Sequence, residues 1–407
     1  MKFFPVWSLF VAGVCSCPGA LAFELPAQAV YVDLTSYAAL GVNSSFRESS
    51  FDNATFFNPT LTEPPFFQVF QEGFLDILGQ SPSIREIASN ASFAFAHEAP
   101  IYFPETDEMF FASNDGGTLG MSDLDHNNVY GKISLAAAED ALEENPDGSI
   151  VNVPVKELAL SEEIQMTNGG TGLYKGSLLL ITSGRGPRPP LIALVNPQEP
   201  HNVTVILDNF FGRQFNSLND IKVHPSSGKI FFTDVTYGYL SGFRPAPMMP
   251  NQIYRFDPDT GNVRVVADGF VRCNGIAFTG DGRTAYVSDT AASGGNLLGL
   301  NQTLPATIYA FDVDENTQTF NNKRVFAYVD AGVPDGIQVD AVGNVYTGCG
   351  DGVHVFDEHG TILGKFFLGS TSANMAFAGD GRLIILAETK VFLAHIAAKG
   401  ISLGGPS

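Results

Sequence analysis

Short runs of alternating apolar and polar residues recur along this chain, and each run is followed by a glycine turn and a second, returning run. Such period-two alternation predicts β-hairpins. In four copies the first run begins directly after a residue at one fixed position, which is acidic or an amide in three of them. These copies span residues 219–232, 274–287, 335–346 and 373–385, and they open at Asn219, Asn274, Asp335 and Ala373.

A looser fifth copy opens at Glu98 and returns through residues 109–112. With a less regular copy at Asn168, the hairpins begin near residues 98, 168, 219, 274, 335 and 373. Hairpins repeated every 40 to 60 residues or so are typical of a β-propeller. The sequence therefore predicts an all-β protein, a six-bladed β-propeller over residues 93–400.

Residues 23–92 lack the repeat and are rich in Ser, Asn, Phe and Pro. We expect them to form an N-terminal extension that packs on the outside of the propeller and lends a strand that closes the ring. Within this extension, residues 66–78 show helix-like apolar spacing despite Gly73.

Composition supports one large folded unit and restricts its partners. Of the 407 residues, 44% are hydrophobic and 34 are Phe, which is enough for a substantial aromatic core. The net charge of −21 makes nucleic acid and anionic membranes poor partners, whereas it suits a soluble protein and a cation. No feature of the sequence points to an obligate protein partner.

Residues 1–22 have the layout of a signal peptide: Lys2, an apolar stretch over residues 3–14, and a small-residue cleavage site at 20–22. We expect a secreted mature chain that begins near Phe23 and keeps two cysteines, which form a disulfide or remain two buried thiols. Those cysteines are Cys273 and Cys349. Five sequons predict N-glycosylation, at Asn43, Asn53, Asn90, Asn202 and Asn301.

Equivalent positions of successive blades converge on one central channel. Glu98, Asn219, Asn274 and Asp335 are therefore expected to form a ring of oxygen ligands. Such a ring favours Ca²⁺ or Mg²⁺ over Zn²⁺ and leaves coordination positions for water or substrate. Residues of these types also cap turns, so a purely structural role stays open. Ala373 at the same place in the sixth copy indicates that the fold itself does not require a polar residue there.

Other polar residues are candidates for binding substrate. They include Asn168, His126 on a loop near the channel, and Tyr237 and Arg244 in the long insertion 236–250. Arg244 would bind a substrate carboxylate or brace its own loop, and His126 would otherwise be a surface residue. His97 is expected to point away from Glu98, as neighbours on a strand do. Ser-His-Asp hydrolase and dinucleotide-binding motifs are absent from the sequence.

Several longer segments are similar to one family. They are His97-Glu98-Ala99-Pro100 and residues 215–220, 232–238, 242–247, 272–275, 333–336 and 348–352. Over roughly residues 93–398 the chain resembles the senescence marker protein/gluconolactonase (regucalcin-like) family of propeller lactonases, and especially its secreted fungal lactonohydrolase members. The resemblance implies that Glu98, Asn219, Asn274 and Asp335 bind a divalent cation, with Ca²⁺ first and Mg²⁺, Mn²⁺ or Zn²⁺ left open. Leu218 and Cys273 stand where fungal members usually have proline, and Ser217 stands where animal members have arginine.

The resemblance implies a calcium-dependent carboxylic ester hydrolase that acts on a small lactone. The metal would polarise the lactone carbonyl, and Asp335 is the candidate catalytic group that takes the proton from water. Two alternatives stay open: an organophosphate or aryl-ester hydrolase with the same metal site, and a non-catalytic ligand-binding propeller. The metal ring argues against an enzyme of strictosidine-synthase type.

Overall fold

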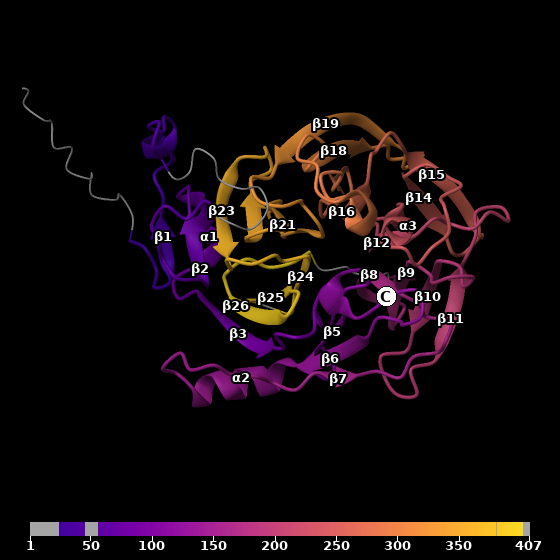
Figure 1. The fold of residues 1–407 in the computed structure, drawn as a ribbon, viewed down its shortest axis with the longest axis horizontal. Helices are drawn as coiled ribbons and strands as arrows, with labels where there is room; N and C mark the ends of the chain where they lie inside the picture. The colour runs from indigo at the N-terminus through magenta and orange to yellow at the C-terminus, as the bar shows by residue number, and fades with distance from the viewer. Residues whose placement is uncertain (1–23, 45–55, 380, 402–407) are drawn as a thin grey trace, which may run out of the picture.

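Six sheets, antiparallel except for the outermost pair of strands in one of them, stand around a central channel (Figure 1). The innermost strand of each sheet contacts the innermost strands of its two neighbours. The computed structural model describes residues 24–44, 56–379 and 381–401. The predicted all-β, six-bladed propeller is thus confirmed. The predicted signal peptide and the sequon at Asn53 lie outside the described residues.

Four blades are built from consecutive strands, each paired antiparallel with the one before it. Blade 1 contains β4 (Glu98–Phe103), β5 (Glu108–Ala112), β6 (Tyr130–Ser134) and β7 (Lys156–Glu157). Blade 2 contains β8 (Thr167–Tyr174), β9 (Ser177–Thr182), β10 (Leu191–Val195) and β11 (Val203–Leu207). Blade 3 contains β12 (Leu218–Val223), β13 (Ile230–Asp234), β14 (Gln252–Asp257) and β15 (Asn262–Ala267). Blade 4 contains β16 (Cys273–Phe278), β17 (Thr284–Asp289), β18 (Thr307–Val313) and β19 (Phe320–Tyr328).

Blades 5 and 6 take strands from the N-terminal part of the chain. Blade 5 contains β20 (Ile337–Val339), β21 (Val345–Cys349), β22 (Gly352–Phe356) and β23 (Ile362–Phe367), and β2 (Phe66–Val69) and β1 (Ala29–Tyr31) extend it outward. Blade 6 contains β24 (Asn374–Phe377), β25 (Arg382–Ala387) and β26 (Lys390–His395), and its fourth strand is β3 (Ser83–Ser89). Because β3 pairs with β26, strands from the two ends of the chain share one sheet and close the ring.

The helices are short and lie outside the sheets. They are η1 (Leu34–Tyr37), α1 (Gly73–Leu78), η2 (Thr118–Gly120), α2 (Leu135–Glu144), α3 (Tyr237–Leu240) and α4 (Gly295–Leu298). The helical spacing expected over residues 66–78 holds only for α1, because Phe66–Val69 forms β2 instead. The exposed edge of β23 supplies backbone partners to these four residues, and that pairing outweighs the local apolar pattern.

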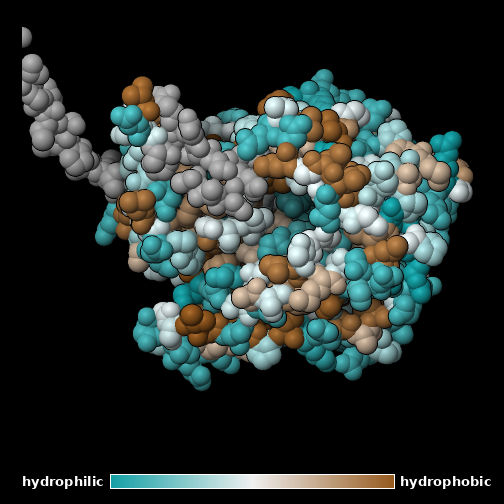
Figure 2. All heavy atoms as spheres, in the orientation of Figure 1, coloured by the Kyte–Doolittle hydropathy of each residue, from teal (hydrophilic) through white to brown (hydrophobic). Residues whose placement is uncertain are grey.

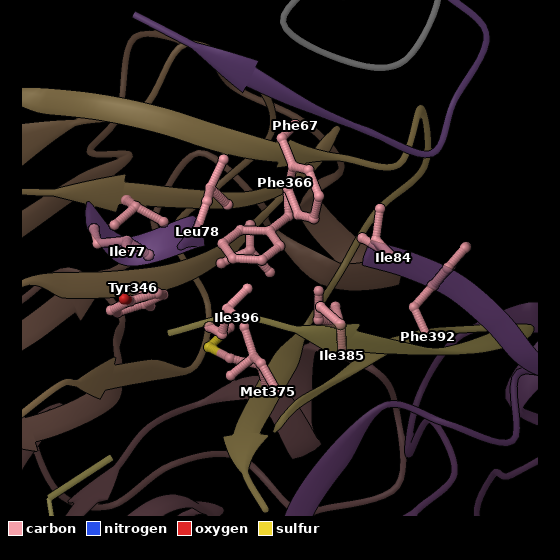
Figure 3. Packing of buried hydrophobic residues seen from close by; sticks show 14 of the residues in the cluster. Phe67, Ile77, Leu78, Ile84, Tyr346, Phe366, Met375, Ile385, Phe392 and Ile396 are labelled. Atoms are coloured by element: carbon pink, nitrogen blue, oxygen red, sulfur yellow. The ribbon is translucent and has the colours of Figure 1, made fainter. Parts of the chain in front are cut away.

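Each junction between neighbouring blades holds one hydrophobic cluster, which gives six clusters among the described residues. Figure 3 shows the cluster between blades 5 and 6, where Phe67 of β2 meets Phe366 of β23 with ring centroids 5.4 Å apart. Each fully buried Phe or Ile contributes roughly 1.5–3 kcal/mol. The blades are therefore held by side-chain packing, and their channel-facing ends are free to carry polar groups.

The structure leaves both Cys273 and Cys349 as free, buried thiols, so the disulfide interpretation is wrong. The Sγ atom of Cys273 faces the carbonyls of Asp234 and Gln252 in the junction of blades 3 and 4. Cys349 packs in the next junction, between blades 4 and 5. A whole sheet separates the two hydrophobic clusters. No helix among the described residues is long and apolar enough to cross a membrane.

Candidate active site

The innermost strands of blades 1 to 4 are irregular at the same place, near the start of each strand. In each of them the pairing register with the second strand shifts across two residues. Such β-bulges turn side chains away from their regular direction. In blades 2, 3 and 4 the first bulge residue is Asn168, Asn219 or Asn274, and in blade 1 the residue just before the bulge is Glu98.

The residue after each amide or acid approaches the neighbouring blade closely. A Cβ atom on Gly275 would lie 2.3 Å from the backbone oxygen of Asp335, and one on Gly169 would lie 2.4 Å from that of Asn219. These positions therefore require glycine for space. Where blade 3 has Asp220 instead, its carboxylate accepts hydrogen bonds from the backbone N–H groups of Ile221 and Ile276 and ties blade 3 to blade 4.

A cavity of about 220 Å³ opens at this end of the channel. All four predicted ligands line it: Glu98, Asn219, Asn274 and Asp335. His97, Glu98 and Asp335 each offer one ligand atom, and these atoms lie within 4.8 Å of one another. A larger depression of about 480 Å³ lies at the opposite end of the channel, lined by backbone and by residues such as Tyr102 and Phe278. The carboxylate and amide side chains predicted to bind a cation therefore line the smaller cavity.

The carboxylates of Glu98 and Asp335, two of those that line the cavity, are held there at a cost in free energy. Burial raises the pKa of Glu98 well above its usual range, and the nearby Asp335 carboxylate adds to the shift. Burial also raises the pKa of Asp335 to about 7, although His97 opposes the change. Hydrogen bonds from Asn374 to Glu98 (2.7 Å) and from Asn274 to Asp335 offset part of this cost. A bound cation would offset more of it.

His97 belongs to the cavity wall, so the expectation that it points away from Glu98 is wrong. It precedes β4, which begins at Glu98, and strand alternation does not apply to it. Burial lowers the pKa of His97, but its Nδ1 lies 2.7 Å from the Glu388 carboxylate, and the surrounding acids together raise the pKa to about 10. Glu388 is the direct partner of the imidazolium, and His97 offsets only part of the charge of Glu98 and Asp335, whose pKa values stay raised.

The Oδ1 atom of Asn219 is buried and has no hydrogen-bond partner among the described residues. Buried amide oxygens are rarely left without a partner. A hard divalent cation prefers such oxygens, and Ca²⁺ takes six to eight of them. Two carboxylates and two amide side chains around one cavity therefore fit a divalent cation with open coordination positions.

The candidate substrate-binding residues divide into two pairs. Asn168 and Tyr237 line the cavity: the amide of Asn168 donates to Asp115 and Ser183, and the Tyr237 hydroxyl hydrogen-bonds to Thr290. Their roles towards substrate stay predictions.

Arg244 and His126 do not line the cavity. Arg244 is buried, and its guanidinium donates to the carbonyls of Asn216, Gly186 and Arg188 and to the side chain of Gln214. It braces its loop, because buried loop carbonyls need donors. The His126 side chain is exposed and hydrogen-bonds to Asp123. Neither residue supports the predicted role in substrate binding.

Sequence reasoning missed Asp115 and Glu388. Asp115 lines the cavity across from the amide of Asn168, which donates to it at 3.1 Å. Glu388 lies in the turn between β25 and β26 and contacts His97. Asp115 stands in the segment Asn-Asp-Gly-Gly, which has the composition of any surface turn. Its place over the channel depends on the path of the loop and could not be inferred from residue types.

Two buried aspartates fix the chain just before the ligand amides. Asp234, at the end of β13, accepts hydrogen bonds from the backbone N–H groups of Asn216 and Ser217, and burial raises its pKa to about 7. Asp289, at the end of β17, accepts from Val271 and Arg272 in the same way. Each aspartate holds the entry to an inner strand and so sets the position of Asn219 or Asn274.

The sequence profile of the SMP-30/Gluconolactonase/LRE-like region matches residues 98–387 of this chain. The chain belongs to this family. The match begins at Glu98 and ends one residue before Glu388, so it includes the innermost strand of every blade and all four predicted ligands. The assignment makes the protein a member of a family of lactone-hydrolysing enzymes.

Individual relatives agree with the assignment. The lactonohydrolase OryL of Aspergillus oryzae is 28% identical over 372 residues, which cover 85% of this chain and 79% of the relative. A gluconolactonase of Zymomonas mobilis is 29% identical over 197 residues, covering 46% of this chain and 52% of the relative. The solved gluconolactonase of Xanthomonas campestris superimposes with a TM-score of 0.61 at 22% identity, covering 81% of this chain and 94% of that one. The structural likeness shows a shared fold.

Proposed function

We propose that this protein is a secreted, calcium-dependent lactonase whose reaction takes place in the cavity formed by Glu98, Asn219, Asn274 and Asp335. The observation that carries the proposal is the buried Oδ1 of Asn219, which has no hydrogen-bond partner among the described residues, in a cavity shared with the carboxylates of Glu98 and Asp335. Lactone hydrolysis follows from the family. The metal requirement follows from the donor set.

Glu98, Asn219, Asn274 and Asp335 would hold the divalent cation, which would supply a Lewis acid for the lactone carbonyl. Asp335 is the group that takes the proton from the attacking water, because Asn274 hydrogen-bonds its carboxylate and the open cavity adjoins it. The water oxygen bonds to the acyl carbon, the bond from that carbon to the ring oxygen breaks, and the proton passes to the ring oxygen. The product is the open-chain hydroxy acid. Tyr237 forms part of the cavity wall, and its hydroxyl is fixed there by a hydrogen bond to Thr290.

Secretion is supported by the predicted signal peptide and by exposed sequon asparagines. Asn43, Asn90, Asn202 and Asn301 are all solvent-exposed, so a glycan could be attached at each without disturbing the fold. Expression in a secreting host followed by endoglycosidase digestion tests this part of the proposal. An unglycosylated protein retained inside the cell would contradict it.

The decisive experiment compares Asn219→Ala with Asn316→Ala, which removes an exposed asparagine far from the cavity. We expect Asn219→Ala to weaken calcium binding by roughly 10- to 100-fold in calorimetry and to lower kcat/KM for lactones. The metal-free variant should keep its stability, since the Oδ1 atom of Asn219 makes no hydrogen bond that would be lost. Asn316→Ala should match the wild type in all three measurements.

Chelation and addition of calcium complete the test. Lactone turnover should disappear when a chelator is added and return when Ca²⁺ is restored. Turnover that is unaffected by the chelator would overturn the metal requirement. Calcium binding without turnover of any lactone would favour an organophosphate or aryl-ester substrate, or a non-catalytic role. Parallel assays on a phosphotriester and an aryl ester separate those two alternatives.

A further inference from the structure

Four exposed apolar side chains stand on the segments that line the polar cavity. Leu119, Tyr239, Leu297 and Leu298 are 45%, 39%, 59% and 60% exposed. Each lies within two positions of a residue that lines the cavity, and the four come from three different loops. Figure 2 shows hydrophilic residues in the central hollow and hydrophobic residues gathered on either side of it. We call these four residues the rim.

The three loops form one continuous border. Asn296 in α4 donates a hydrogen bond to the backbone oxygen of Gly116, three residues before Leu119. Tyr237 in α3 reaches the backbone oxygen of Ser293, which precedes α4. These contacts fix the rim side chains relative to one another and to the cavity. Exposed apolar residues grouped in this way mark a binding surface rather than ordinary surface variation.

We infer that the lactone substrate carries an apolar substituent, an alkyl chain or an aromatic ring, that rests on the rim while its lactone ring enters the polar cavity. This inference rests on the proposed lactonase function. The rim continues directly from the cavity, so one small molecule can occupy both. A sugar lactone would place hydroxyl groups against four apolar side chains and would gain no hydrophobic contact with the rim.

Alkyl-substituted lactones test the inference. We expect kcat/KM to rise along a series of γ-lactones whose straight side chain grows from zero to six carbons. A fully buried methylene is worth about fourfold, the equivalent of about 0.8 kcal/mol. Because the rim is half-exposed, we expect about twofold per methylene. D-glucono-1,5-lactone should be a poorer substrate than the six-carbon member.

The variant carrying both Leu297→Ser and Leu298→Ser should flatten the dependence of kcat/KM on chain length, mainly through KM. The matched control is Val342→Ser, which removes an 82% exposed apolar side chain in the turn between β20 and β21, away from the cavity. It should leave the dependence intact. Circular dichroism checks that both variants fold.

The outcomes separate this inference from the function on which it rests. Turnover of lactones with no dependence on chain length in the wild type overturns the inference alone. A flat dependence together with sedimentation of the protein on phosphatidylcholine vesicles would assign the rim to a lipid surface instead. Failure to turn over any lactone overturns the proposed function and the inference with it.

Discussion

Replacing Lys365 with Met tests how much a single buried charge in blade 5 contributes to the free energy of unfolding. Lys365 is 1% exposed, and its Nζ lies 2.8 Å from Oδ2 of Asp351 and 2.8 Å from both carboxylate oxygens of Asp330. Asp351 is fully buried and also contacts Nε2 of His354 at 2.6 Å. Removing the ammonium leaves Asp351 buried with only an imidazole beside it. Breaking one partner out of a buried ion pair costs about 3–5 kcal/mol.

The assay is urea unfolding followed by circular dichroism, because the only tryptophan, Trp7, lies in the predicted signal peptide. Lys390→Met is the matched control. Lys390 pairs with Glu86 at 2.7 Å, but its side chain is 44% exposed, so we expect a loss of about 0–1 kcal/mol. If Lys365→Met cost no more than Lys390→Met, the argument from burial would be refuted.

The pH dependence gives a second check on the same pair. Although burial alone would raise it, Lys365 and His354 lower the pKa of Asp351 below its ordinary value of 3.8. A carboxyl whose pKa is lower in the folded state contributes stability above its unfolded pKa and loses that contribution as the pH falls. The difference in unfolding free energy between wild type and Lys365→Met should therefore shrink below about pH 4. A difference that grows on acidification would contradict this sign.

Two further predictions concern space and redox state. Gly275→Ala would place its Cβ 2.3 Å from the backbone oxygen of Asp335, so we expect a loss of about 1–3 kcal/mol and a fall in kcat/KM of about 100-fold. Gly73→Ala, whose Cβ meets its nearest atom at 3.7 Å, should change stability by less than about 1 kcal/mol in the same melts. Because Cys273 and Cys349 are free and buried, iodoacetamide should modify both only in denaturant, as read by peptide mass spectrometry. A bridged tryptic peptide would show instead that the two thiols are paired.

The fold could be predicted because the same sequence pattern recurs in successive blades. Alternation and glycine turns specify a hairpin locally, and the repeat specifies a ring without knowledge of distant contacts. In a ring of blades, equivalent positions of successive blades lie close together at the channel. Asn219, Asn274 and Asp335 could therefore be assigned to one cavity from sequence alone.

Residues outside the repeat escaped this reasoning. Asp115 reaches the cavity through the path of a loop, and Glu388 reaches His97 from a turn, and no repeat specifies either position. Arg244 belongs to a loop that is folded inward. Its guanidinium donates hydrogen bonds to backbone carbonyls whose positions could not be inferred from the sequence. Residues 66–69 became a strand because a distant edge was available to pair with them. In all these cases tertiary context decided the outcome.

Blade 6 contributes no predicted ligand, yet it helps to position one of them. It lies between blade 5, whose first strand β20 begins two residues after Asp335, and blade 1, whose first strand β4 begins at Glu98. Its Asn374 donates a hydrogen bond to Glu98, and its strand β26 pairs with β3 to close the ring. Without blade 6 the chain would still contain all four predicted ligands, but Glu98 would lose the hydrogen bond from Asn374. Closure of the ring and the geometry of the candidate site are therefore linked.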